Sequence, residues 1–184
     1  MTEPKDLGVL RAIREDELGL MLSWRNAPKV RENMYTRHEI SMSEHLDWWG
    51  RSKGREDQRY FMFERFEKPV GIVGFSSIDS INSNSSWAFY ASPDAPRGTG
   101  SRMEYLALEY AFDSLGLNKL YCEVLGFNVA VVKLHQKFGF KVEGVLREQH
   151  LHGISFVDVY RLGILSSEWR ERSVALKEKI LSLN

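Results

Sequence analysis

Three consecutive strand-like segments lead into a glycine-containing turn and a long helix, and this order constrains the fold more than any other feature. The strands are predicted over residues 59–66, 70–78 and 87–90. The turn is Arg97-Gly98-Thr99-Gly100-Ser101, after which apolar residues recur at helical spacing until Gly116, a C-cap position. Strands that follow one another through short connections pair antiparallel, so we expect a meander packed against one helix.

The segments on either side extend this unit. We expect a strand at 9–13 and then three helices, the third opened by Ser41 and Glu44 at capping-box spacing. After the long helix we expect a strand at 120–125, a helix at 128–137, strands near 145–151 and 154–165, and a final helix to about residue 183. The sequence thus predicts a single α+β domain over residues 1–184, with a mixed, mostly antiparallel sheet flanked by helices.

The composition excludes several classes of partner. Lys and Arg number 25 and Asp and Glu 25, so no net charge attracts nucleic acid or an acidic membrane. The single cysteine, Cys122, excludes an internal disulfide and a cysteine-rich zinc site. The first residues are polar, and no apolar stretch reaches membrane-spanning length. We therefore expect a cytoplasmic protein with neither a nucleic-acid nor a membrane partner, and we leave both a monomer and a homodimer open.

The turn at residues 97–101 carries the first chemical signal. Its two glycines stand at the start of a helix, where backbone N–H groups and the helix dipole can hold a pyrophosphate, and Arg97 adds a charge. The alternative is a flexible loop before a helix. A dinucleotide-binding site is excluded, because its fingerprint needs three glycines within a parallel βαβ unit.

These residues and a second segment carry a family resemblance. The turn is similar to the acetyl-CoA signature of GCN5-related N-acetyltransferases (GNAT), with Gly98 and Gly100 at the glycine positions and Ala95 where the family has Gln or Arg. Downstream, Asn128 and the segment from Leu134 to Phe140, which contains His135 and the Phe138-Gly139-Phe140 sequence, resemble the family's second signature. The resemblance covers nearly the whole chain and implies the GNAT fold.

The resemblance also implies that acetyl-CoA is the co-substrate and that no metal is required. Phe89, Tyr90 and Ala91 would pair with the pantetheine arm, and Asn128 would form a hydrogen bond with the cofactor. The backbone amides of the turn would hold the pyrophosphate; its residues are Arg97, Gly98, Thr99, Gly100 and Ser101. Lys137 lies in a basic cluster with Lys133, Lys141 and Arg147, which is either a solvated surface or the surroundings of the phosphates.

Acetyl transfer to an amine needs a base and a proton donor for the leaving sulfur. Glu123 is the candidate base, because it lies on an apolar strand beside the cofactor cleft of the family; an ion pair on an edge strand is the alternative. His135 occupies the position at which many family members have a tyrosine that acts as the general acid. It is therefore either the general acid or a packing residue. Cys122 is interpreted as a core residue. His150 and His152 are interpreted as a solvated hairpin end rather than a metal site.

The first third of the chain is rich in aromatic and basic residues, which suit a nucleotide diphosphate, although at least one of Trp48 and Trp49 is expected in the core. Its motifs, together with the segment from Leu146 to Val159, resemble nucleotide-sugar N-acetyltransferases of pseudaminic acid biosynthesis. That resemblance implies a UDP-4-amino-4,6-dideoxy sugar as acceptor, in a pathway that glycosylates flagellin. The residues it places against this acceptor are Arg25, Met34, Tyr35, Trp87 and Glu123.

Two other functions stay open. One is acetylation of ribosomal proteins or protein N-termini, since that related group of enzymes shares the C-terminal architecture. The other is a non-catalytic module that binds acetyl-CoA, for which Ala95 and the missing tyrosine are mild support. The intact Gly98, Gly100, Asn128 and Glu123 favour an enzyme.

Overall fold

The computed structural model describes residues 6–182, and seven strands of this part form one sheet in the order β1-β2-β3-β4-β5-β7-β6. Strands β4 and β5 are parallel and the other neighbouring pairs are antiparallel, which confirms the predicted mixed α+β sheet. The strands are β1 Val9–Ala12, β2 Arg59–Arg65, β3 Lys68–Asp79, β4 Asn84–Ala91, β5 Lys119–Leu125, β6 Lys141–His152 and β7 Ser155–Leu165.

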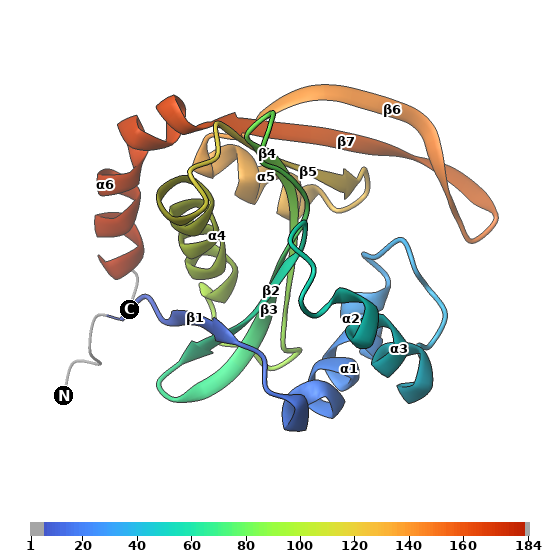
Figure 1. Ribbon diagram of the computed structural model, residues 1–184. Coiled ribbons are helices and arrows are strands. Elements are labelled where there is room, and N and C mark those ends of the chain that lie inside the picture. Colours follow the sequence, from blue (N-terminus) through green and yellow to red (C-terminus); the bar gives the residue numbers. More distant parts are fainter. Residues whose placement is uncertain (1–5, 183–184) are drawn as a thin grey trace.

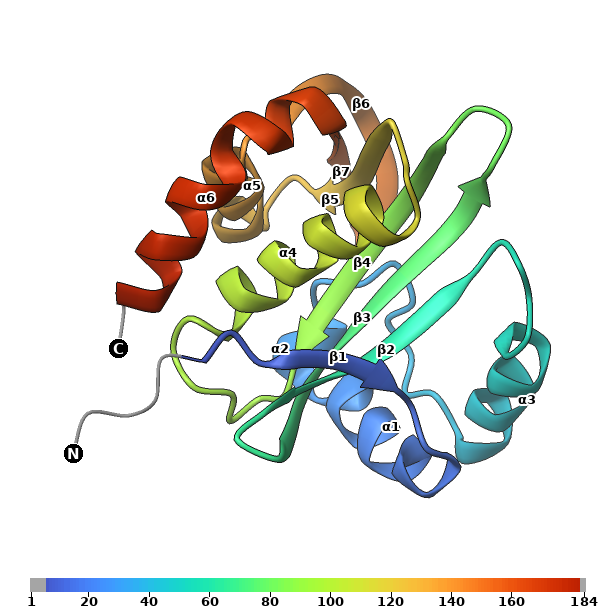
Figure 2. The same cartoon turned by 60° about the vertical axis from the view of Figure 1, so that its left-hand side comes forward.

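Helices cover both faces of the sheet (Figures 1 and 2). One face carries α4, Thr99–Glu109, which continues as a π-helical turn at Tyr110–Ser114, together with α5, Val129–Phe138, and α6, Ser166–Ser182. The other face carries α1, Leu18–Asn26, α2, Pro28–Arg31, and α3, Met42–Ser52, after a short 3-10 turn at Glu15–Glu17. No helix among the described residues is long and apolar enough to cross a membrane.

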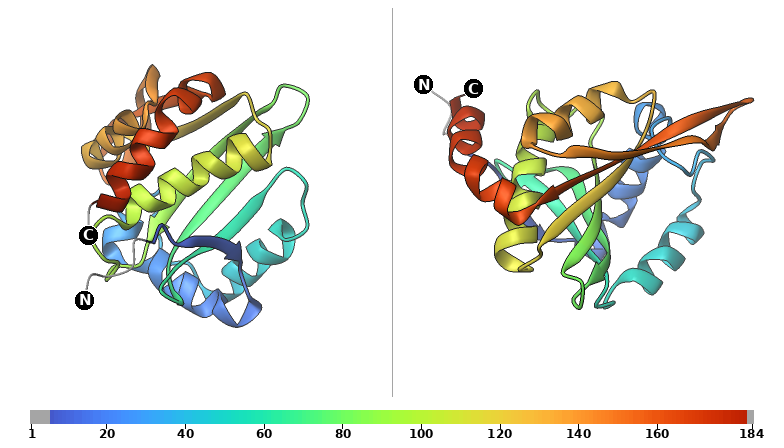
Figure 3. Two further views of the ribbon diagram at one scale, coloured as in Figure 1. Left: turned by 90° about the vertical axis from the view of Figure 1, so that its left-hand side faces the viewer. Right: turned by 90° about the horizontal axis from the view of Figure 1, so that it is seen from above.

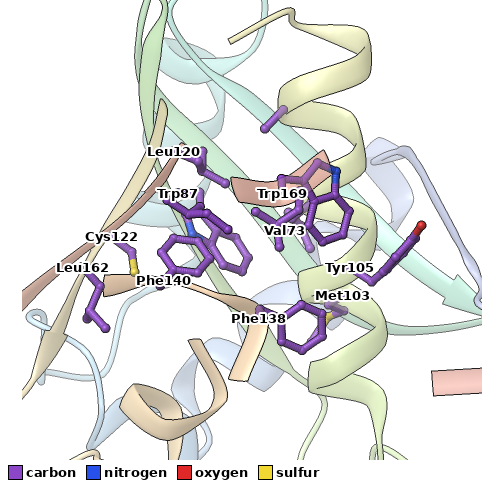
Figure 4. Close-up of a cluster of buried hydrophobic side chains, with 14 of the residues drawn as sticks. Val73, Trp87, Met103, Tyr105, Leu120, Cys122, Phe138, Phe140, Leu162 and Trp169 are labelled. Carbon is purple, nitrogen blue, oxygen red and sulfur yellow. The ribbon is translucent and has the colours of Figure 1, made fainter. Parts of the chain in front are cut away.

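Side-chain alternation along the strands separates two hydrophobic cores. Met62 and Ile72 belong to the smaller core, which also contains Met21 and Trp24 of α1. The adjacent residues on these strands point to the opposite face, where they join the larger core below α4, α5 and α6. In that core Trp87 and Phe140 are stacked with their ring centroids 6.1 Å apart (Figure 4). The period of two in these strands therefore places a helix layer on each face.

The parallel pair β4 and β5 separates after a short paired stretch. Only Asn84 to Ser86 of β4 pair with Lys119 to Tyr121 of β5, whereas β4 stays paired with β3 as far as Ala91. Beyond Ser86 the edge of β4 that faces β5 has no strand beside it among the described residues. The two strands thus open a gap in the middle of the sheet, where the candidate functional site lies.

Strands β6 and β7 form a long hairpin that reaches beyond the rest of the molecule (right-hand view of Figure 3). Its turn is at Gly153 and Ile154, one residue later than predicted. Its two histidines are partly buried against different aromatic rings rather than solvated together. The ring centroids of His150 and Tyr35 are 5.1 Å apart in an edge-on contact, and those of His152 and Phe127 are 4.5 Å apart.

Two boundaries in the meander differ from prediction. The β2–β3 turn is at Phe66 and Glu67, both at positive φ (51° and 59°), rather than at residues 67–69. Strand β4 begins at Asn84 instead of Trp87, because its polar Ser85 is fully buried and donates a hydrogen bond to the carbonyl of Ser76 on β3. Backbone pairing with two neighbouring strands outweighs the low strand propensity of this Asn-Ser tract.

Candidate active site

Two adjoining cavities lie along β4 at the gap in the sheet. The larger, of about 410 Å³, lies on the α1–α3 face, and the smaller, of about 260 Å³, opens between β4 and β5. Both are lined by Met34, Ala88, Phe89 and Tyr90. A ligand in one cavity can therefore meet a ligand in the other at β4.

The smaller cavity brings together many of the residues predicted from sequence. Its walls come from β4, β5, α5 and the segment after α2. The predicted residues among its lining are Met34, Trp87, Phe89, Tyr90, Ala91, Glu123, Asn128 and His135. This cavity collects the candidate base, the candidate acid and all three β4 residues that the resemblance assigns to the cofactor.

Glu123 extends from β5 into the smaller cavity with a partner on each carboxylate oxygen. The hydroxyl of Tyr35 donates to Oε2 at 2.8 Å, and Nη1 of Arg161 on β7 donates to Oε1 at 3.2 Å. The side chain of Glu123 is 33% exposed, so water and an incoming amine can reach the carboxylate. Burial and this carboxylate raise the pKa of the Tyr35 hydroxyl, which therefore stays a donor.

His135 is buried, and its Nδ1 lies 2.8 Å from Oε1 of Glu104 on α4. The rings of Trp87, Phe89 and Phe140 surround the imidazole. Burial opposes the imidazolium, but the Glu104 carboxylate and, secondarily, the Cys122 side chain outweigh it and raise the pKa of His135 to about 10. Burial also raises the pKa of the Glu104 carboxyl, and the neighbouring His135 opposes this rise.

The start of α4 has the geometry of an anion site. Gly98 is the N-cap in the left-handed region at φ +86°. The N–H of Thr99 donates to the carbonyl of Pro96 at 3.2 Å, whereas the N–H groups of Gly100 and Ser101 have no helical carbonyl to bind. A Cβ on Gly100 would lie 3.4 Å from Leu134 on α5 and 3.7 Å from Phe89 on β4, so the turn packs against the cleft wall. These observations fit a diphosphate group, as the resemblance to acetyl-CoA-dependent enzymes predicts.

Other predicted cofactor residues occupy different positions. Thr99 is buried and donates its hydroxyl to the carbonyl of Pro96, which stabilises the turn itself. Arg97 and Lys137 are exposed, and neither lines the two cavities described above. They stay candidates for contacts with phosphates outside the cleft.

The larger cavity has an aromatic wall and a half-buried cation. Trp48 and Tyr60 meet edge-on with centroids 4.9 Å apart. Arg25 donates from Nη2 to the carbonyl of Thr36 at 3.2 Å, while its buried Nη1 has no hydrogen-bond partner among the described residues. Burial lowers the pKa of Arg25. The cavity thus presents an unsatisfied guanidinium N–H beside aromatic rings.

Comparison with known proteins identifies the family. Residues 9–141 match the family described as "Acetyltransferase (GNAT) domain". The chain is a GNAT acetyltransferase. Acetyltransferase PseH of Campylobacter jejuni is 27% identical over 130 residues, which are 71% of this chain and 80% of that protein. Spermidine N(1)-acetyltransferase of Vibrio cholerae is 26% identical over 166 residues, 89% of this chain and 96% of that protein.

Solved structures support the fold. The crystal structure of spermidine N-acetyltransferase from Vibrio cholerae in complex with CoA and spermine has a TM-score of 0.83 and 24% identity, and covers 88% of this chain and 97% of that one. At this identity the likeness establishes the fold of the GNAT enzyme alone.

Sequence reasoning missed two charged residues that contact the candidate acid and the candidate base. Glu104 lies on the buried face of α4 between Met103 and Tyr105, and a carboxylate on an apolar helix face was the available signal. Arg161 pairs with Glu123 across the β5–β7 register, which only the strand order reveals.

Proposed function

We propose that this GNAT enzyme transfers the acetyl group of acetyl-CoA to the 4-amino group of UDP-4-amino-4,6-dideoxy-N-acetyl-β-L-altrosamine, in pseudaminic acid synthesis for flagellin. The sequence resemblance and the similarity to PseH support a nucleotide sugar. The similarity to spermidine acetyltransferases points instead to a polyamine. Since a nucleotide sugar is anionic and a polyamine cationic, the charge of the larger cavity is the discriminating observation.

That charge supports the anionic acceptor. Within residues 6–182, the one carboxylate in the lining of the larger cavity is Glu44, and it is already engaged. The backbone N–H of Ser41 donates to its Oε2 at 2.8 Å, and Nε2 of His38 lies 3.0 Å from its Oε1. These contacts lower the pKa of Glu44 to about 2. Arg25, by contrast, has a buried N–H without a partner, which a phosphate or carbonyl oxygen would satisfy.

The size and the walls of the cavity also suit this substrate class. Its volume of about 410 Å³ lies within the roughly 300–1,000 Å³ of small-molecule sites. Trp48 and Tyr60 offer aromatic surface to a base or a sugar face. A polyamine would need carboxylates to pair with its ammonium groups, and among the described residues the lining of this cavity offers none besides the engaged Glu44.

The shared lining of the two cavities supports direct transfer in a ternary complex. Acetyl-CoA supplies the acetyl group and leaves as the thiol. Glu123 accepts a proton from the sugar amine, directly or through a water molecule, and a backbone N–H of Tyr90 or Ala91 stabilises the oxyanion. His135 protonates the leaving sulfur. Cys122 is buried at the cavity floor, and this route gives it no covalent role.

A competition between acceptors tests the proposal. The purified protein is incubated with acetyl-CoA and either the UDP-4-amino sugar, spermidine or a peptide with a free N-terminus, and products are identified by mass spectrometry. We expect acetylated UDP-sugar and kcat/KM at least 100-fold above that for spermidine. Preferential acetylation of spermidine or the peptide would overturn the acceptor assignment.

A charge variant links the result to the cavity. Arg25→Gln should raise KM for the UDP-sugar at least tenfold and leave KM for acetyl-CoA within twofold. The control is Arg51→Gln, an exposed arginine of α3 outside the cavity lining, which should change neither constant. An Arg25→Gln enzyme with unchanged KM for the UDP-sugar would contradict an anion contact there.

A further inference from the structure

The buried pair of Glu104 and His135 joins two helices inside the larger core. Its side chains are 0% and 3% exposed, with 2.8 Å between Oε1 and Nδ1. Burying an ion pair costs desolvation that its attraction repays only in part, and apolar residues of similar volume commonly hold such a position as well or better. A purely structural link between α4 and α5 would thus not need a carboxylate here.

Glu104 also has a defect as a structural residue. Its Oε2 is buried and has no hydrogen-bond partner among the described residues. A buried acceptor without a partner lowers stability, because nothing compensates for the loss of its contacts with water. Such a cost in a native core is typical of groups that are retained for function.

One nitrogen of the His135 ring is not bonded to Glu104, and His135 lines the smaller cavity. Nδ1 of His135 is taken by Glu104, so Nε2 is the nitrogen left for other partners. His135 lines the smaller cavity together with Glu123 and Cys122, and the Cys122 side chain on β5 also raises the pKa of the imidazole. Lys137 also acts on the pair, because its charge lowers the pKa of Glu104.

We propose that Glu104 is a positioning residue, which fixes the tautomer of His135 and keeps Nε2 protonated as the proton donor for the leaving CoA sulfur. This inference rests on the acid role given to His135 in the proposed function. As the C–S bond breaks, its electron pair goes to sulfur, the S–H bond forms and the Nε2–H bond breaks. Nδ1 keeps its proton throughout and donates it in the hydrogen bond to Glu104. Nε2 regains a proton from solvent after the thiol has left.

Glu104→Gln tests the charge while keeping a carbonyl oxygen for Nδ1–H. Without the carboxylate, the largest influence that raises the pKa of His135 is lost while burial still lowers it, so this pKa should fall toward the ordinary value of about 6.5. Turnover, measured as release of CoA thiol with any acceptor that the enzyme uses, should drop at least tenfold at pH 8. At pH 6 it should stay within threefold of wild type, and KM for acetyl-CoA should stay within twofold at both.

Two controls separate positioning from stability. Leu108→Ala removes a fully buried side chain from the same helix, and it should lower the melting temperature without moving the pH profile. His135→Gln should reduce turnover at both pH values, and the double variant Glu104→Gln/His135→Gln should be no slower than His135→Gln alone. An unmoved pH profile in Glu104→Gln, or losses that multiply in the double variant, would overturn the proposal.

A titration of the wild-type protein needs neither acceptor nor variant. With ¹⁵N-labelled histidine, the His135 signals should stay those of a protonated ring above pH 8; a ring that is neutral at pH 7 would overturn the inference. The test is independent of the acceptor. If His135 is protonated and the enzyme acetylates spermidine, the role of Glu104 is upheld and the nucleotide-sugar assignment is overturned.

Discussion

The hydroxyl of Tyr35 donates a 2.8 Å hydrogen bond to Glu123 across 88 residues of sequence. Tyr35 belongs to the loop between α2 and α3, and Glu123 belongs to β5. Tyr35 itself lines neither cavity, but its neighbours Met34 and Thr36 line the larger one, so the bond ties the loop that carries them to the candidate base.

Removal of this bond should affect the acceptor and not the donor. Tyr35→Phe keeps the ring contact with His150 and loses the hydroxyl, a loss of about 1.5 kcal/mol for a hydrogen bond to a charged group. We expect a roughly tenfold increase in KM for the acceptor, the equivalent of that energy, with KM for acetyl-CoA within twofold. Steady-state kinetics with each substrate varied in turn measure both constants, and an equal rise in both would speak against a loop tether.

Glu123→Gln should lower kcat about 100-fold or more, since general-base catalysis contributes roughly 10²–10⁴. Acetyl-CoA affinity, measured by isothermal titration calorimetry, should change much less. Arg161→Met is the matched variant, because it removes the ion pair from Oε1 and retains the carboxylate. If Glu123→Gln and Arg161→Met lose similar turnover, the ion pair rather than proton transfer accounts for the effect.

Gly98 is the residue of the turn whose backbone conformation excludes other side chains. It lies at φ +86°, and a Cβ there would approach Nη1 of Arg102 to 2.7 Å. Gly98→Ala should lower the melting temperature and raise KM for acetyl-CoA about tenfold, because the N–H groups of the first turn would shift. Gly116 is also at positive φ but has open space around it, so Gly116→Ala carries similar strain far from the cleft. Donor binding unaffected by Gly98→Ala would contradict the role of this turn.

Glu17 should make folding stability depend on acid pH. Its carboxylate accepts hydrogen bonds from Arg11 at 2.6 and 2.8 Å and from the backbone of Arg14, and the Arg11 contact lowers its pKa to about 2. A depressed pKa gives stability that is complete above the unfolded value of about 4.5 and lost as the pH falls toward 2. Glu17→Gln should be about 3 kcal/mol less stable than wild type at pH 7, where a buried charge pair is broken.

Urea denaturation at pH 7 and pH 2.5 measures this difference, which should shrink at the lower pH. The exposed Glu15→Gln, which only loses a contact with Lys53, serves as control. A gap between wild type and Glu17→Gln that is equal at both pH values would show that the Glu17 charge is not its cause.

Local signals predicted the elements of this fold well. Ser41 and Glu44 form the expected capping box, with the side chain of each accepting from the backbone N–H of the other, because this motif depends on four consecutive residues. The Phe66-Glu67 turn was misplaced by a residue, since non-glycine residues at positive φ leave no sequence signal.

Long-range relationships were beyond local patterns. The sequence predicts that Glu123 and His135 belong to one site, on the strength of family motifs, and the structure places both in one cavity. Glu104 was not predicted, since its role depends on how α4 packs against α5 and not on its neighbours in sequence. Whether a buried carboxylate has a partner is decided by tertiary packing.

The gap between β4 and β5 leaves part of the sheet without a complete set of backbone hydrogen bonds. Beyond Ser86, one edge of β4 retains amide donors and acceptors that no neighbouring strand uses among the described residues. If the amide-bearing arm of the donor lies against this edge, the ligand takes the place of a missing strand. Donor binding would then complete the hydrogen bonds of the sheet, and the donor-bound enzyme, which can react, would be its most rigid form.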